Sequence, residues 1–257
     1  MALQDTDIVI YGSTNMQENN TATPQGGSIN TAIKMTFVDI TGTNPSPVNI
    51  VSDNIADTGN LLVTGRSVGG SVTTDTISLN GTTLASGSTN FERILKIYET
   101  GHIGTVTITA QNGGYTLATL ESGVEQVRRP FYSPTGNAAG GSDLYFYEKV
   151  FIKNNSTGND LLSMTIGEDS DGTEAVSADI TFAIETGLNG TGVSTNRITS
   201  PDTGVLLSGE FSDNTKSLPG NNLTIGDAIG VWLRLYVPAG TSPTNTTFSF
   251  DINGATT

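Results

Sequence analysis

The chain has 257 residues, with no cysteine, 25 acidic and 11 basic side chains, and a formal net charge of −14. This charge argues against a nucleic-acid-binding role, because phosphate recognition needs clustered lysine and arginine. The lack of cysteine excludes disulfides, thiolate nucleophiles and cysteine-ligated metals. No apolar run approaches the roughly 20 residues that span a bilayer, so we expect no membrane partner.

Apolar residues occur in short alternating runs that Gly, Pro, Asn or Asp interrupt every eight to twelve residues or so, which predicts an all-β chain. The first strand covers residues 7–11, and a polar loop containing Pro24 follows. Because this strand lacks an evident partner in residues 37–122, we expect residues 1–36 to supply an N-terminal arm and strand to the C-terminal domain. An alternative is that residues 1–30 extend as an arm and add a strand to a neighbouring molecule.

Residues 37–122 are expected to form a small immunoglobulin-like β-sandwich. The Asn80-Gly81 pair is the strongest local signal in this region, because Asn-Gly readily adopts the positive φ angles of a tight hairpin turn. The Gly69-Gly70 and Gly113-Gly114 pairs predict further hairpin turns. The expected strands cover residues 48–51, 61–64, 74–79, 91–98, 104–110 and 115–120.

A segment rich in Pro and Gly, residues 123–142, is predicted to be a linker, with Arg128-Arg129 as a solvated turn. Residues 143–257 are expected to form the second, larger β-sandwich, of immunoglobulin-like or jelly-roll-like type, into which the smaller domain is inserted. The expected strands of this domain cover residues 143–153, 161–166, 180–184, 204–211, 228–237 and 247–252.

No arrangement of residues predicts a catalytic, cofactor-binding or metal site, and we expect a protein that is not an enzyme. His102 is the only histidine, and its place in a turn between two strands predicts a solvated side chain. The acidic run 168–174 has some features of a calcium loop but lacks the spacing of an EF-hand, so calcium binding stays open. Trp232 lies in an apolar strand and is expected to pack in the core.

Several segments resemble a module of the virion structural proteins of tailed bacteriophages. The resemblance covers about half of the chain and consists of strands and turns, without a catalytic signature. The segments are Thr74–Thr83, Phe91–Ile97, Gly104–Ile108, Tyr147–Asn154, Ile225–Arg234 and Val237–Gly240.

The resemblance implies a capsid decoration (cement) protein that binds the major capsid protein on the outer surface of the shell and stabilises it. It also implies a homo-oligomer, with a trimer favoured, and it carries over no functional residues. The segment Met1–Asp7 lacks the basic and apolar regions of a secretory signal, so we expect synthesis in the host cytoplasm and assembly into the virion. The alternatives are another virion part, such as a tail, baseplate or head-fibre protein with a host-binding sandwich, and a carbohydrate-binding module or minor hydrolase.

Overall fold

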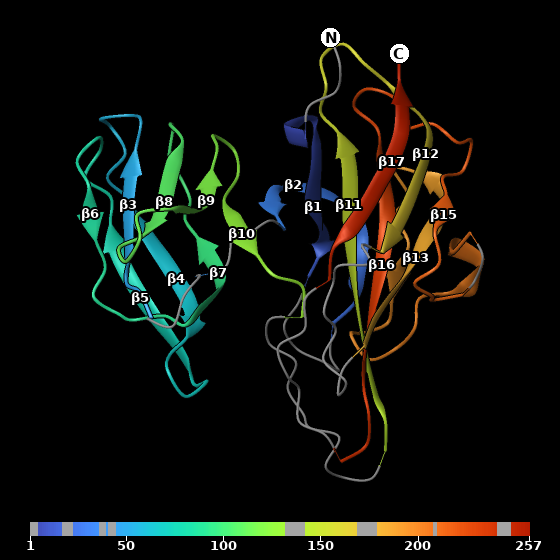
Figure 1. Cartoon of the computed structure of the whole chain (residues 1–257), viewed down its shortest axis with the longest axis horizontal. Helices are drawn as coiled ribbons and strands as arrows, with labels where there is room; N and C mark the ends of the chain where they lie inside the picture. Colours follow the sequence, from blue (N-terminus) through green and yellow to red (C-terminus); the bar gives the residue numbers. More distant parts are fainter. Residues whose placement is uncertain are drawn as a thin grey trace. The chain divides into compact units, whose positions relative to one another are not determined.

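A computed structural model of the whole chain describes residues 5–16, 23–35, 40, 45–131, 142–168, 179–207, 210–240 and 248–257 (Figure 1). The described residues contain β-strands and short 3-10 turns but no α-helix, so the prediction of an all-β chain is confirmed. They include no apolar helix of membrane-crossing length.

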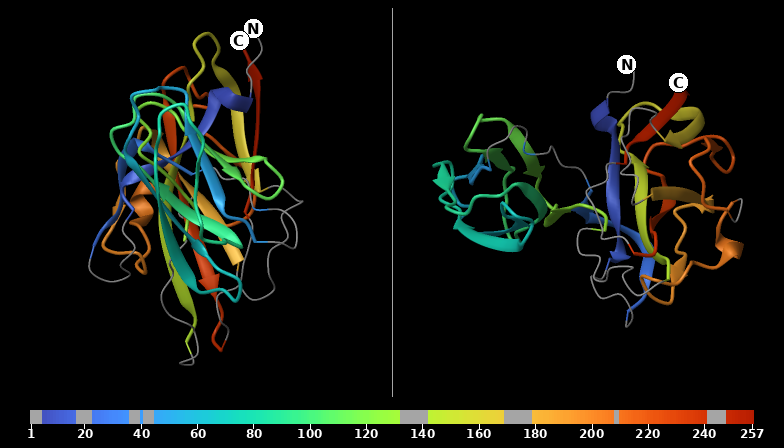
Figure 2. Two further views of the ribbon diagram at one scale, coloured as in Figure 1. Left: turned by 90° about the vertical axis from the view of Figure 1, so that its left-hand side faces the viewer. Right: turned by 60° about the horizontal axis from the view of Figure 1, so that its bottom comes forward.

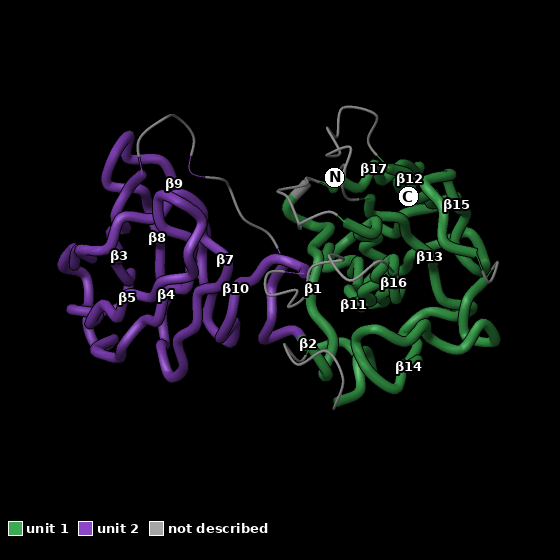
Figure 3. Tube along the Cα trace, turned by 90° about the horizontal axis from the view of Figure 1, so that it is seen from below, with its two compact units in different colours: residues 1–30, 133–257 green, residues 31–132 purple. Residues whose placement is uncertain are grey.

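The chain divides into two compact units (Figure 3). Unit 1 consists of Met1–Asn30 and Ser133–Thr257, and unit 2 consists of Thr31–Tyr132. The sequence of unit 2 therefore lies between the two segments of unit 1, and the boundary at Asn30 falls within a single strand, β2 (Gln25–Lys34).

In unit 1 the N-terminal strand β1 (Ile8–Asn15) pairs antiparallel with β11 (Leu144–Asn154), and the two lie side by side in Figures 1 and 2. Residues 8–12 are thus bound within their own chain, and the alternative of an arm reaching a neighbour through this strand is wrong. Strand β11 is long and rich in aromatic and β-branched residues, which favours a central strand. The order of this sheet is β13 (Asp179–Leu188), β16 (Ala228–Val237), β11, β1 and β2, with β14 (Val193–Ser194) paired to β2.

A second sheet of unit 1 has the order β15 (Lys216–Ser217), β12 (Leu161–Glu168) and β17 (Phe250–Thr256). Phe182 of β13 packs edge-on against Phe250 of β17, with 5.8 Å between ring centroids. Aromatic side chains from both sheets therefore meet in unit 1. Trp232 on β16 is fully buried, which confirms the prediction that it packs in the core.

Unit 2 has one set of strands in the order β10 (Gln126–Arg128), β7 (Arg93–Tyr98), β4 (Asn60–Arg66) and β5 (Val72–Ser78). A separate sheet has the order β6 (Ala85–Ser86), β3 (Val48–Ser52), β8 (Val106–Ala110) and β9 (Thr116–Leu120). Inward-facing residues of both sets, such as Val63, Ile97, Ile50 and Ile108, belong to one buried cluster. The alternation of buried and exposed residues along β4 explains why this strand could be predicted from the sequence.

The predicted turns at Gly69-Gly70 and Gly113-Gly114 are confirmed, and all four glycines have positive φ. Gly81 also has a positive φ, of 56°, but the turn after Asn80 connects β5 to β6, which pairs with β3. The Thr83 N–H donates to the Asn80 carbonyl over 3.0 Å and an isolated antiparallel bridge joins these two residues, so the expected tight turn is confirmed, but the pairing does not extend along β5 and β6.

Four further expectations are wrong. The polar loop containing Pro24 that was predicted to follow residues 7–11 contains strand β2, and a short strand, β10, lies in the predicted linker. Arg128 belongs to β10 and is buried, so the Arg128-Arg129 pair is not a solvated turn. Thr203–Val205 is a 3-10 turn and Leu206 forms only an isolated bridge with Glu185, so the described residues of the expected strand 204–211 form no regular strand.

Candidate functional site

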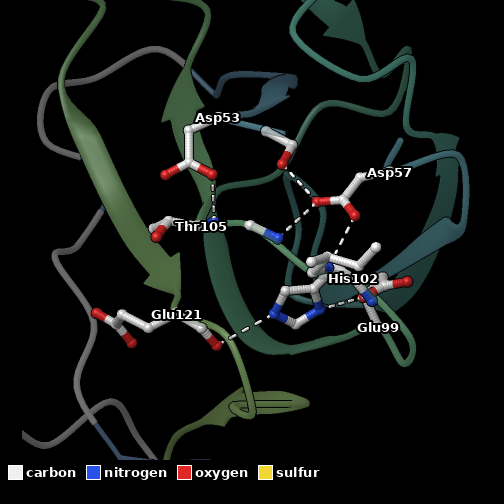
Figure 4. A network of polar contacts seen from close by, with 9 residues as sticks. Asp53, Asp57, Glu99, His102, Thr105 and Glu121 are labelled. Carbon is white, nitrogen blue, oxygen red and sulfur yellow. Dashed lines mark hydrogen bonds and ion pairs between the residues drawn. The ribbon is translucent and has the colours of Figure 1, made fainter. Parts of the chain in front are cut away.

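Three loops of unit 2 converge around the buried carboxylate of Asp57, and we call residues 53–57, 80–84 and 99–105 the loop end of unit 2 (Figure 4). The Ser52 hydroxyl donates to Asp57 Oδ2 over 2.5 Å, and the backbone N–H groups of Ile103 and Gly104 donate to the two oxygens over 2.8 and 3.1 Å. The Gly81 N–H donates to the Asp57 carbonyl over 2.8 Å. One aspartate therefore connects all three loops.

Two other carboxylates accept hydrogen bonds from the backbone of the third loop, residues 99–105. The His102 N–H donates to Glu99 Oε2 over 3.2 Å, and the Thr105 N–H donates to Asp53 Oδ1 over 2.7 Å. Together with the bonds to Asp57, four successive backbone amides from residue 102 to residue 105 each donate to a carboxylate. Hydrogen bonds to charged acceptors are stronger than those between neutral groups, so this loop has a well-defined conformation without regular secondary structure.

The His102 side chain lies beneath this loop and is only 2 % exposed, so the expectation of a solvated histidine is wrong. Its Nδ1 atom contacts Glu99 Oε2, and its Nε2 atom lies 3.1 Å from the Glu121 carbonyl oxygen (Figure 4). Both ring nitrogens thus face protein acceptors. This arrangement joins two loops and leaves neither nitrogen directed at a hydroxyl nucleophile.

Electrostatics favour the charged form of Asp57. Burial alone would raise the pKa of this carboxyl, but the hydrogen bonds from Ser52, Ile103 and Gly104, together with the charge of His102, hold the pKa below its ordinary value. An ionised carboxylate that accepts several hydrogen bonds is the expected result of such surroundings.

Glycine is required where the loops approach one another. A Cβ atom at Gly104 would overlap the Asp53 carboxylate, and one at Gly81 would lie 2.6 Å from the Ile55 carbonyl oxygen. No sequence motif marks this network, because its side chains come from residues 52–57 and 99–102, which lie far apart in the sequence, and residues 80–84 contribute only a backbone N–H. The only local signal is Glu99, which stands three residues before His102.

Each of the three loops also carries an aliphatic side chain that faces solvent. Ile55 is 80 % exposed, Leu84 56 % and Ile103 60 %. Single exposed apolar residues are common on protein surfaces, but here all three belong to backbone that Asp57 fixes. Rigid presentation of apolar side chains lowers the entropy cost of binding a protein partner.

Unit 1 contains a buried polar cluster that the sequence did not reveal. The ammonium of Lys149 lies 2.8 Å from Glu185 Oε1 and donates to the carbonyl oxygens of Gly27 and Gly190 over 2.8 and 2.9 Å. The indole N–H of Trp232 donates to the same Glu185 oxygen over 3.1 Å. Burial lowers the pKa of Lys149, and its contact with Glu185 opposes this effect without reversing it. The cluster connects β11, β13, β16, β2 and the loop after β13.

The acidic run 168–174 lies mostly outside the described residues, since only its first member, Glu168, is described. Glu168 lies close to Asp179 and Asp213. Burial raises the pKa of Glu168, and the charges of Asp213 and Asp179 raise it further. No group of three or more histidine or acidic side chains within the described ranges is placed to hold a metal ion.

The negative charges near Glu168 predict that its carboxylate destabilises the folded protein in a pH-dependent way. A carboxyl whose pKa is raised by folding contributes stability at pH values below its unfolded pKa and loses that contribution as the pH rises through the folded pKa. Glu168→Gln should therefore raise the thermal midpoint at pH 7 by about 1–2 °C and leave it unchanged at pH 3.5. Calorimetry at both pH values tests this, and an equal shift at both would contradict the electrostatic cause.

Comparisons with protein-family models, with curated proteins and with solved structures give no match to this chain.

Proposed function

We propose that this chain is a non-enzymatic decoration (cement) protein of a tailed-phage capsid, which binds the major capsid protein on the outside of the shell and stabilises it. In this proposal both units are β-sandwiches of immunoglobulin-like or jelly-roll type. The protein is made in the host cytoplasm and joins the virion as a homo-oligomer, with a trimer favoured.

The observation that carries the proposal is the loop end of unit 2. The buried carboxylates and His102 hold two of its loops, a backbone hydrogen bond from Gly81 to Asp57 joins the third, and each loop exposes one aliphatic side chain. Such a surface suits contact with another protein, because interfaces bury apolar anchors at their centre and keep polar groups at the rim. The use of both His102 ring nitrogens in protein contacts favours a structural role for this residue over an acid-base role.

A second line of support comes from the sequence. The segments that resemble virion structural proteins include Gly104–Ile108, which begins in the third loop, and Phe91–Ile97, which forms most of β7. The resemblance and the loop end therefore meet in the same part of unit 2. An acidic surface with few charges also fits a part that must remain soluble before it assembles.

Binding to capsids tests the proposal directly. Purified protein is mixed with capsids stripped of accessory proteins, and the number of copies bound per major capsid subunit is measured by sedimentation and gel densitometry. We expect saturation at a fixed ratio compatible with icosahedral sites, together with greater resistance of the particles to heat. No binding would overturn the proposal, and a handful of copies per particle would favour a tail or fibre protein.

Two variants then test the role of the loop end. Ile103→Asp places a charge at the proposed contact and should weaken capsid binding about tenfold or more. Val68→Asp is the matched control, because Val68 is 69 % exposed but lies in the turn between β4 and β5. Equal binding of the two variants would show that the loop end is not the contact surface.

A further inference from the structure

The outward face of the strands β10, β7, β4 and β5 of unit 2 is cationic, although the chain as a whole is strongly acidic. The pairing registers Thr64↔Lys96 and Lys96↔Arg128 place these side chains in one row. Arg66 and Arg93 are also paired across β4 and β7. We call these outward positions the cationic face: Leu62, Thr64, Arg66, Val72, Thr74, Thr76, Arg93, Lys96, Tyr98, Gln126 and Arg128.

None of these outward positions is occupied by an acidic residue. Asp75 lies in β5 between Thr74 and Thr76 but pairs with the buried Val63, so it is not one of the outward positions. Glu92 and Glu125 precede β7 and β10, and Glu99, which follows β7, is buried. Arg128 is buried, whereas Arg66, Arg93 and Lys96 are partly exposed. Three partly exposed basic residues thus lie on one sheet face, which is not the even mixture of signs that a passive surface shows.

Apolar side chains accompany this charge. Val72 is 58 % exposed, Tyr98 40 % and Leu62 36 %. Leu62 and Tyr98 are directly paired across β4 and β7, and the Lys96 ammonium lies 5.8 Å from the centroid of the Tyr98 ring. The Arg66 guanidinium donates to the Gly70 carbonyl over 2.6 Å, which fixes its direction. Arginine, tyrosine and aliphatic residues together are typical of protein interfaces.

The negative charge of the chain is concentrated in the other unit. Unit 1 contains 17 acidic and 5 basic residues, whereas unit 2 contains 8 acidic and 6 basic residues. In unit 1 Glu168 and Asp213 lie near one another and near Asp179, and burial together with the charge of Asp179 raises the pKa of both, while Arg234 and Lys216 partly offset this at Asp213. A second copy of the chain therefore offers an acidic surface that complements the cationic face.

We propose that the cationic face of one copy docks on the acidic surface of unit 1 of a second copy, so that the chain associates head to tail. Such a heterologous contact uses two different surfaces and closes into a ring when the rotation between copies permits it. The inference does not rest on capsid binding, since it concerns the purified chain alone.

The size of the face sets the strength of the contact. Strands lie about 4.8 Å apart and rise about 3.3 Å per residue, so the face measures roughly 20 by 20 Å. This area of about 400 Å² is smaller than the roughly 800 Å² per partner of a standard stable interface. The association should therefore be weak, with a Kd on the order of 10–100 µM in low salt. Because it depends on partly exposed charges, salt should weaken it.

Sedimentation equilibrium of the purified chain between about 10 and 300 µM tests the proposal. In 50 mM NaCl we expect reversible association, and in 500 mM NaCl a Kd at least about tenfold higher. Arg66→Glu should abolish association within this concentration range. Lys153→Glu is the matched control, because it makes the same charge change on β11 of unit 1, and it should leave association intact.

The outcomes are distinct. A chain that remains monomeric at 300 µM in 50 mM NaCl, or association that salt does not weaken, would overturn the proposal. Equal effects of Arg66→Glu and Lys153→Glu would also overturn it, since net charge alone would then explain the loss. Arg66→Gln removes the charge without adding repulsion and serves as a control for misfolding. If circular dichroism shows that this variant is folded, its Kd should lie between the values for the natural chain and for Arg66→Glu.

Discussion

Replacing Lys149 by methionine should lower the free energy of unfolding by about 3–5 kcal/mol, which is the largest effect that we expect from a single substitution in unit 1. Methionine fills a similar volume but leaves the Glu185 carboxylate buried without its cation. Its Oε2 atom already has no hydrogen-bond partner among the described residues, so the remaining negative charge would be poorly solvated. Denaturant unfolding followed by Trp232 fluorescence measures the loss, because the indole N–H contacts Glu185 directly.

The double variant Lys149→Met with Glu185→Leu separates the two possible origins of this loss. If the cost comes from an uncompensated charge, removal of both charges should restore most of the stability, as apolar replacements of buried ion pairs commonly do. Lys153→Met on the same strand is the control and should change stability by less than about 0.5 kcal/mol. A double variant as unstable as the single one would indicate that the contacts with Gly27 and Gly190 are the main contribution.

Local patterning made much of the fold predictable. Strands with a clear alternation of buried and exposed residues, such as β4 and β8, and the aromatic strand β11 were located to within a few residues. Strand β2 was missed because its sequence, Gln25–Lys34, begins with a glutamine, two glycines and further polar residues, and only pairing with other strands makes it extended. Tertiary context outweighs such weak local preferences.

The candidate site was less predictable than the fold. Long-range contacts bring Asp57 and Glu121 to His102, and no spacing rule connects residues so far apart in the chain. The buried Lys149 was equally hidden, since a lysine that follows Glu148 in a strand is compatible with an outward side chain. Its burial follows from the loop after β13, whose Gly190 carbonyl oxygen accepts from the ammonium.

Asp57→Ala tests whether the loop end depends on this one carboxylate. The substitution leaves the Ser52 hydroxyl and the N–H groups of Ile103 and Gly104 without their acceptor, which should lower the free energy of unfolding by about 3 kcal/mol. Asp53→Ala is the matched control, because Asp53 accepts one backbone bond, from Thr105, and should cost about 1 kcal/mol. Denaturant unfolding at pH 7 measures both values.

The same variant has a defined dependence on pH. Because the pKa of Asp57 is lowered in the folded protein, its ionisation contributes stability above the unfolded value near 3.8, and this contribution is lost as the pH falls through the folded pKa. The difference in stability between the natural chain and Asp57→Ala should be complete at pH 7 and should shrink below about pH 4. If the loop end binds the capsid, Asp57→Ala should also weaken capsid binding more than Asp53→Ala does. A stability difference that is the same at pH 3 and pH 7 would show that packing, and not the ionised carboxylate, holds the three loops together.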